Sequence, residues 1–143
     1  MSYRGEGAEQ PRPAQSYART YRAADCTVVE VHGEVDIMGV LEVGPPLDAA
    51  TGGAAPLVVI DLTPTTFLDC SGLALLARAH RRTVERGARL RLVCADPMVL
   101  RTLRAGGVTD LLEPLPTVDA ALGPRGPEPV RPATGVMGAA PGR

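Results

Sequence analysis

The apolar and polar residues of this chain follow two periods, and the first is typical of β-strands. Residues 27–35 (TVVEVHGEV) are rich in β-branched side chains and predict a strand that ends near Gly33, and residues 16–22 (SYARTYR) are placed to pair with it across a turn. Residues 56–62 (PLVVIDL) form a continuous apolar run, which predicts a central strand covered on both sides or deep in a sheet. Residues 89–95 (RLRLVCA) alternate and predict a further strand.

The second period is helical and is clearest after residue 70. Apolar residues recur there with the i, i+3, i+4 spacing of one helix face, and Gly87 is expected to end this helix. Asp96 predicts the N-cap of a next helix, which has Pro97 in its first turn and runs to about Ala105. Thr117 predicts the N-cap of a last short helix. The predicted apolar face of the first of these helices consists of Leu73, Leu76, Ala77, His80 and Val84.

Two consecutive prolines limit the helix that is predicted after the first strands. Pro45 and Pro46 are expected to break any helix through MGVLEVG, because proline has no N–H and its ring clashes with the preceding turn. Residues 46–53 are therefore predicted as only one or two helical turns, which stop at Gly52.

The remaining segments complete the predicted order of elements. Residues 63–69 are predicted as a turn, and residues 110–116 as a short edge strand, because their two prolines exclude a central strand. Strands and helices then alternate, which implies parallel pairing and crossover connections. The sequence thus predicts an α/β fold, with a mixed sheet of four to five strands packed against three to four helices.

Composition divides the chain into a folded part and two tails. Residues 1–15 are rich in Gly, Pro, Glu and Gln and predict a flexible N-terminal arm, whereas residues 123–143 alternate prolines with glycines and predict a second flexible tail. The folded domain is expected at 16–122. Because aromatic residues make up 3% of the 143 residues and the net charge is −1, modules that stack on bases or attract nucleic acid by charge are disfavoured.

The cysteines and the apolar runs carry little chemistry. Cys26, Cys70 and Cys94 are odd in number and widely spaced, which fits neither a disulfide framework nor a zinc site. The N-terminus lacks the apolar core of a signal peptide, and no apolar run approaches the ~20 residues that span a bilayer. We therefore expect a soluble, cytoplasmic protein with reduced cysteines, no metal and no cofactor.

Candidate chemistry concentrates in FLDCSGLALL, where a strand, a turn and a helix follow one another. Asp69 or Ser71 is suited to cap that helix. Ser71 does not lie in the G-x-S-x-G pattern of hydrolases, and His80 is two helical turns away on the apolar face. Cys70 lacks the second cysteine of C-x-x-C. Without a catalytic constellation, the residues favour a binding or switching module over an enzyme.

Three sequence blocks together resemble one known family. They are VVEVHGEVDI, LVVIDLTPTTFLDCSGLALL and LRLVCADPMVLRTLRAGGVTDLLEPLPTVDAAL, and they cover the folded part of the chain. The most specific pieces are G-E-x-D at 33–36 and D-L…F-x-D-x-S-G at 61–72. In these blocks the chain resembles the STAS domain of anti-sigma factor antagonists. The prolines in the first helix depart from the family pattern.

The resemblance implies a function without enzyme activity. Such a protein binds an anti-sigma factor that is also a serine kinase, and thereby releases a sigma factor for transcription. The kinase phosphorylates the serine before the glycine, here Ser71, and a serine phosphatase reverses the modification. Cys70 stands where family members often have a second serine. The composition and charge already disfavour nucleic-acid and membrane partners, and we expect a monomer. The implied partner-binding residues are Gly33, Asp36, Asp61, Thr66, Asp69, Cys70, Ser71, Gly72 and Leu73.

Physical reasoning supports a surface switch at Ser71. A phosphate would add roughly −1.5 to −2 charges, which the helix N-terminus favours and which Asp69 and Asp36 oppose. The main effect is therefore expected on a partner docked over this turn. Two alternatives stay open from the sequence: a STAS-type scaffold that binds its partner constitutively, with Ser71 only a helix cap, and an enzyme with Cys70 or Ser71 as nucleophile.

Overall fold

A β-hairpin opens the fold. In the computed structural model, which describes residues 16–123, β1 (Ser16–Ala23) pairs antiparallel with β2 (Cys26–Val35). Ala24 closes the turn with a φ of 58°. The predicted pairing of these strands is confirmed, although β2 continues two residues beyond Gly33.

The other strands run parallel to β2, and the two halves of β2 pair with different strands. β3 (Leu57–Asp61) pairs with the first half of β2, and β5 (Arg89–Val93) pairs with β3. All five residues of β3 are buried, as its continuous apolar run predicted. The sheet order is β1-β2-β3-β5, and β4 (Thr65–Leu68) pairs with the second half of β2.

The prediction of a turn over residues 63–69 was wrong, because this segment contains β4. This strand has only four residues and joins β2 after a shift of register between Gly33 and Glu34. The buried hydroxyl of Thr65 donates a hydrogen bond to the carbonyl of Val31 at 2.8 Å, which fixes the strand against β2. So short a strand has too few positions to show a period in the sequence.

Helix α1 (Gly39–Thr51) runs unbroken through Pro45 and Pro46, so the predicted break was wrong. Because the two prolines have no N–H, the carbonyls of Leu41 and Glu42, four residues earlier, lose their usual helical donors. Both of these residues are exposed to water. The opposite side of α1 is buried against the core through Val43, Leu47 and Ala50. The helix ends at Gly52, as predicted.

The C-terminal half holds α2 (Cys70–Glu85), α3 (Pro97–Ala105) and α4 (Val118–Leu122). Asp96 and Thr117 cap α3 and α4 with their side chains, which confirms both predictions. The buried face of α2 differs from the predicted one, because Val84 is 56% exposed while Thr83 is buried. Thr83 tolerates burial because its hydroxyl donates to the carbonyl of Ala79.

The predicted edge strand at 110–116 is absent. A short 3-10 turn, η1 (Val108–Asp110), ends at the first residue of this segment. Within the segment only Leu115 forms a β-bridge, which pairs it with Val93 of β5. Pro114 and Pro116 flank Leu115, and a proline cannot donate to a ladder of hydrogen bonds.

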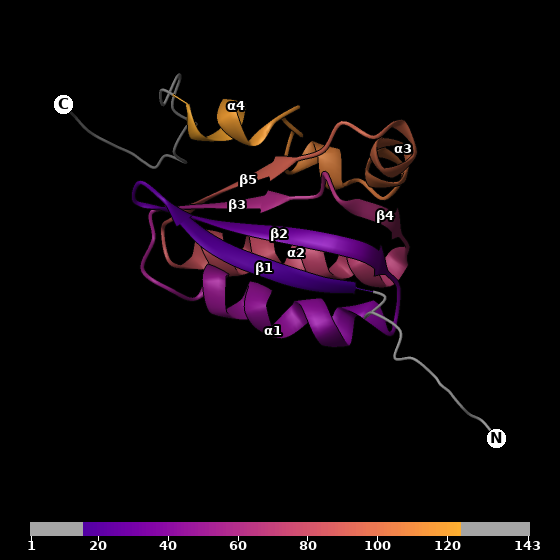
Figure 1. The fold of residues 1–143 in the computed structure, drawn as a ribbon, viewed down its shortest axis with the longest axis horizontal. Coiled ribbons are helices and arrows are strands. Elements are labelled where there is room, and N and C mark those ends of the chain that lie inside the picture. Colours follow the sequence, from indigo (N-terminus) through magenta and orange to yellow (C-terminus); the bar gives the residue numbers. More distant parts are fainter. Residues whose placement is uncertain (1–15, 124–143) are drawn as a thin grey trace, which may run out of the picture.

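The sheet is covered unequally on its two faces (Figure 1). Helices α1 and α2 cover one face and enclose the larger core, while α4 packs on β3 and β5 over a smaller one. Within residues 16–123, no helix has the length and apolar character needed to cross a bilayer.

Candidate docking site at the start of α2

Three helices begin at one end of the sheet. Because β2, β4 and β5 are all parallel to one another through the sheet, their carboxyl ends lie on one side, and α1, α2 and α3 follow them in turn (Figure 1). Binding sites of α/β sheets gather at this end. Both motif blocks of the sequence, residues 33–36 and 61–72, reach it.

Asp69 is the N-cap of α2. Its backbone is extended, and its Oδ1 atom accepts hydrogen bonds from the N–H groups of Ser71 at 2.8 Å and Gly72 at 3.4 Å. The sequence left open whether Asp69 or Ser71 caps the helix, and the structure gives this role to Asp69. Ser71 is half-buried in the second helical position, and its hydroxyl makes no hydrogen bond within residues 16–123.

Gly72 brings the two motif blocks together. A Cβ at this position would clash with the Leu68 side chain and would lie 2.9 Å from the carbonyl oxygen of Val35. The N–H of Asp69 donates to that same carbonyl at 3.4 Å. The first turn of α2 therefore rests directly on the end of β2, one residue before Asp36, because position 72 has no side chain.

Asp36 turns the chain from β2 into α1. Its Oδ1 atom accepts hydrogen bonds from the N–H groups of Met38 at 3.0 Å and Gly39 at 2.8 Å. Asp36 and Asp69 thus use their carboxylates in the same way, at the starts of neighbouring helices. Both carboxylates therefore lie at the end of the sheet where α2 begins.

The other residues of the predicted site occupy different depths. Thr66 and Cys70 are exposed, and Leu73 is half-buried against the core. Asp61 is buried, and its carboxylate accepts two hydrogen bonds from Thr63, so it shapes the loop after β3 from the inside.

Gly33 lies within β2, where the register shifts and β4 begins to pair. Its φ of 89° belongs to the left-handed region that favours glycine. Its N–H donates to the carbonyl of Pro64 at 3.1 Å. Gly33 therefore ties the loop after β3 to β2, and through that loop it sets the position of β4.

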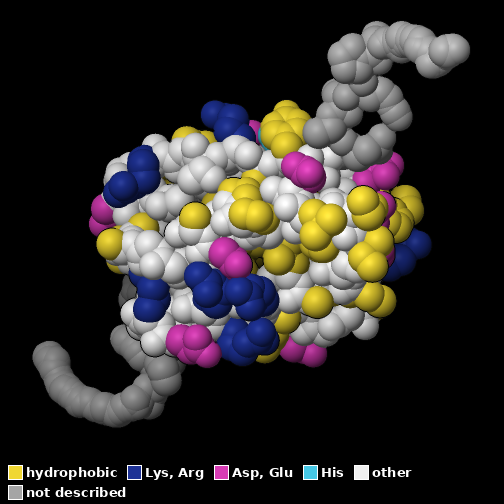
Figure 2. Space-filling model, turned by 90° about the horizontal axis from the view of Figure 1, so that it is seen from below, with side chains coloured by type: hydrophobic (Ala, Val, Ile, Leu, Met, Phe, Trp, Pro, Cys, Tyr) yellow, Lys and Arg dark blue, Asp and Glu magenta, His cyan; other side chains and the backbone are white. Residues whose placement is uncertain are grey.

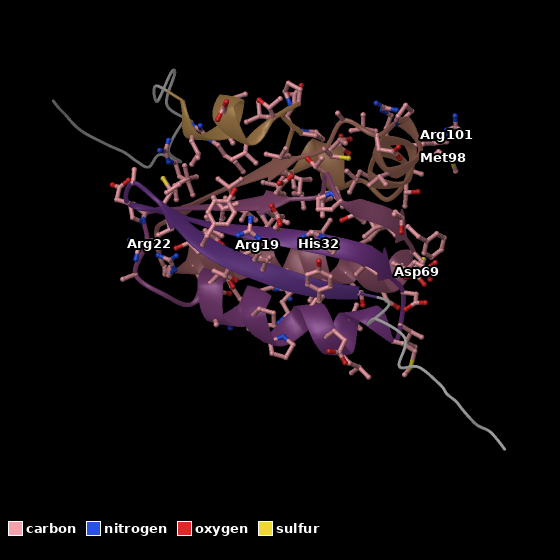
Figure 3. The ribbon with its side chains drawn as sticks, viewed as in Figure 1. Arg19, Arg22, His32, Asp69, Met98 and Arg101 are labelled. Atoms are coloured by element: carbon pink, nitrogen blue, oxygen red, sulfur yellow. The ribbon has the colours of Figure 1, made fainter. Side chains whose placement is uncertain are left out.

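An apolar rim surrounds the start of α2, and sequence reasoning missed it. Figure 2 views the α1 side and shows hydrophobic side chains gathered toward the end where α1 begins. Figure 3 places Met98 and Arg101 of α3 at the same end as Asp69. The available signal was the apolar run next to G-E-x-D, which is longer than one helix face needs. The apolar rim consists of Ile37, Met38, Leu41, Phe67 and Met98, which are 48–68% exposed.

The described residues do not form a hydrolytic centre around Ser71. His80 lies nine residues further along α2, about 13 Å by helical rise. His32 is bonded to Glu30 at 2.7 Å on β2. Within residues 16–123, no three His, Cys, Asp or Glu side chains are grouped to hold a metal ion. The site offers an exposed turn, a hydroxyl with no hydrogen bond to the described residues and apolar surface, which suit the docking of another protein.

Similar proteins point in the same direction. A family model described as the STAS domain matches residues 17–121. The chain is 43% identical over 77 residues to a Mycobacterium tuberculosis protein named as an anti-anti-sigma factor, a match that covers 53% of this chain and 52% of that protein. It is 40% identical over 74 residues to the anti-sigma-F factor antagonist RsfA of Mycobacterium tuberculosis, covering 52% of this chain and 57% of RsfA. The chain thus spans about half the length of these curated relatives.

A solved structure shows the same fold over more of the chain. It is an anti-sigma factor antagonist from Mycobacterium paratuberculosis, which superimposes with a TM-score of 0.71 at 25% sequence identity. The match covers 79% of this chain and 96% of that one. The mixed five-stranded sheet with its helices is therefore the fold of that structure as well.

Proposed function

This chain belongs to the STAS domain family, and from that premise we propose that it is an anti-sigma factor antagonist. It binds an anti-sigma factor with serine-kinase activity through the start of α2 and the apolar rim, and this binding releases a sigma factor for transcription. Phosphorylation of Ser71 by the bound kinase ends the interaction, and a serine phosphatase restores it. The names of the similar proteins support the antagonist role.

The observation that carries this proposal is the state of the Ser71 hydroxyl. Asp69 supplies the cap of α2, and the hydroxyl of Ser71 has no partner within residues 16–123. It therefore contributes no hydrogen bond to the described fold. Phosphorylation would leave the cap bond to the Ser71 N–H in place, because that bond uses the backbone and not the hydroxyl.

Charge explains how a phosphate would act as a switch. The added charge of roughly −1.5 to −2 lies at a helix N-terminus, which favours it within the free protein. Asp36 and Asp69 stand at the same end and add negative charge. A partner packed on the apolar rim would have to bury this dianion beside two carboxylates, and such desolvation is unfavourable. The fold persists while docking fails.

A constitutive STAS-type scaffold is the second candidate, and it rested on Ser71 as a helix cap. That basis is weaker now that Asp69 occupies the cap position. The two candidates still differ in one measurable property, because a scaffold binds its partner equally well with or without charge at position 71.

Binding of three variants to a purified anti-sigma factor kinase of the same organism tests the proposal. Ser71→Ala is expected to bind like the wild type and to accept no phosphate from ATP, as read by intact-protein mass. Ser71→Asp is expected to bind at least about tenfold more weakly, because it adds a charge at the docking turn. Thr20→Ala is the matched control, because it removes an exposed hydroxyl of β1 that is not among the predicted partner-binding residues. This variant is expected to bind the kinase and to be phosphorylated at Ser71 like the wild type. Equal phosphorylation of Ser71→Ala and the wild type would disprove the acceptor assignment.

A further inference from the structure

The sheet face opposite α1 and α2 carries an aromatic surface on its β1–β2 half. Tyr21 of β1 packs against the same small core as α4, so it points to the α4 side of the sheet. Side chains alternate along a strand, which places Tyr17 and Arg19 on that side too. The register pairs Tyr17 with His32 and Arg19 with Glu30 on β2. Figure 3 shows Arg19 and His32 on this part of the sheet. These five residues are called the aromatic surface below.

Contacts among these side chains hold the rings in place. The rings of Tyr17 and His32 stack with centroids 4.3 Å apart and planes 9° from parallel. The Arg19 guanidinium lies over the Tyr21 ring, 4.8 Å from its centroid. Arg19 also donates to the Glu30 carboxylate at 3.0 Å, and His32 contacts that carboxylate at 2.7 Å. These bonds, that of Arg19 first, hold the pKa of the Glu30 carboxyl below its usual range.

Such a surface is ready to bind without further ordering. Rings that are already fixed lose little conformational entropy when a ligand packs on them. Tyr17 keeps 48% of its surface exposed even though one face of its ring is stacked. Its exposure equals that of Phe67 in the apolar rim, but Phe67 lies on β4, on the other side of β2 from β1.

The described chain ends beside this surface. Val118 and Leu122 of α4 pack against the small core that also receives Tyr21 and Ala23. Figure 1 shows the last turn of α4 on the side of the molecule where the β1–β2 hairpin turns. The last described residues therefore lie on the side of the Tyr21 end of the aromatic surface.

The sequence that follows α4 is rich in regularly spaced prolines. Residues 124–127 (PRGP) and 129–132 (PVRP) both have the P-x-x-P spacing. Proline fixes φ near −65°, which favours the polyproline II conformation. Segments of this kind bind to aromatic-lined surfaces, because the proline rings pack on the aromatic rings and the segment is already ordered.

We propose that residues 124–132 bind to the aromatic surface of the same chain as a polyproline II segment. In that conformation residues 124–132 extend about 28 Å, at about 3.1 Å per residue. The part of β1 from Tyr21 to Tyr17 measures only about 14 Å, at about 3.4 Å per residue. The segment is thus long enough to reach both tyrosines from the end of α4.

Two other occupants are less suited to this surface. The N-terminal segment joins β1 at Ser16, next to Tyr17, but its Pro11 and Pro13 do not have the P-x-x-P spacing. The same proline segment of a second copy has the right chemistry, but the local segment has the higher effective concentration, because it is tethered next to the surface. The aromatic surface shares no residue with the predicted partner-binding residues or with the apolar rim, so the proposal stands or fails separately from the proposed function.

The test uses nuclear magnetic resonance on the full-length chain. Substitutions in the proline segment are read at the aromatic surface, and substitutions at the aromatic surface are read in the proline segment. Replacing Pro127, Pro129 and Pro132 by Gly is expected to shift the amide signals of residues 17–21 and 30–32, and to leave those of 37–41 and 70–73 unchanged. Replacing Pro11 and Pro13 by Gly is the matched control and is expected to leave all four regions unchanged. In the other direction, Tyr17→Ser is expected to shift the amide signals of residues 125–131, whereas Phe67→Ser, with an equally exposed ring, is expected to leave them unchanged.

Each outcome decides the proposal. Shifts in both directions, independent of protein concentration, support binding within one chain. Unchanged signals at residues 17–21 in the proline variant would overturn it, as would shifts at 37–41 in their place. Shifts that disappear on dilution would assign the segment to a second copy and would also overturn it.

Discussion

Helices α2 and α3 begin with the same cap and differ in the residues that follow it. Asp69 and Asp96 are both extended residues whose carboxylates accept hydrogen bonds from the N–H groups two and three positions later. The second helical position is Ser71 in α2 and Met98 in α3. The third is Gly72 in α2 and the buried Val99 in α3.

This difference separates structure from function at the start of α2. An aspartate cap serves both helices, so the cap itself does not mark a site. What sets α2 apart is a close approach to β2 through Gly72 and a hydroxyl that makes no bond within the described chain. In α3 the corresponding positions carry apolar side chains, one buried in the core and one exposed in the apolar rim. Asp69 and Gly72 therefore hold the start of α2 in place. The Ser71 hydroxyl makes no hydrogen bond on which this part of the described fold depends.

The largest effect is expected from Gly72→Ala. The added methyl group would meet the Leu68 side chain and the Val35 carbonyl, so we expect the free energy of unfolding to fall by about 2 kcal/mol, as in other overpacked cores. Urea denaturation measures this change. Gly53→Ala is the control, because its nearest atom would lie at 3.4 Å, and it is expected to change stability by less than about 0.5 kcal/mol. Equal stability of the two variants would show that α2 does not depend on this close approach.

An intermediate effect is expected from removing either cap. Asp69→Ala and Asp96→Ala should each lower the free energy of unfolding by about 1 kcal/mol, because each leaves two N–H groups of a first turn without their acceptor. Asp69→Asn and Asp96→Asn keep an acceptor and should lose less. If Asp69→Ala were neutral while Asp96→Ala was destabilising, the two helix starts would not be equivalent after all.

The smallest effect is expected from Ser71→Ala. Because the hydroxyl has no partner within residues 16–123, the free energy of unfolding should change by less than about 0.5 kcal/mol. Urea denaturation of Ser71→Ala beside Asp69→Ala measures the two in one experiment. If Ser71→Ala lowered the free energy of unfolding by about 1 kcal/mol, Ser71 would have a structural role like that of a helix cap. That result would favour the constitutive scaffold.

Local sequence patterns were sufficient wherever an element carries its own signal. The buried strand β3 follows from a continuous apolar run, and the starts of α3 and α4 follow from Asp96 and Thr117. The same kind of reasoning failed for α1, where Pro45 and Pro46 predict a break that the helix does not show. It failed because a proline breaks a helix less readily when the carbonyl four residues earlier, which loses its N–H donor, faces water. Packing decides whether that carbonyl faces water or the core.

The site divides in the same way. The sequence alone placed Ser71 at the start of a helix after a strand, next to a capping carboxylate, because caps and turns depend on neighbouring residues. Only the tertiary structure showed which residue caps, that Asp61 is buried, and that apolar side chains from α1, β4 and α3 meet around this turn. Those residues are up to 61 positions apart in the chain, from Ile37 to Met98. Parallel strands bring them together, because their carboxyl ends must lie at one edge of the sheet.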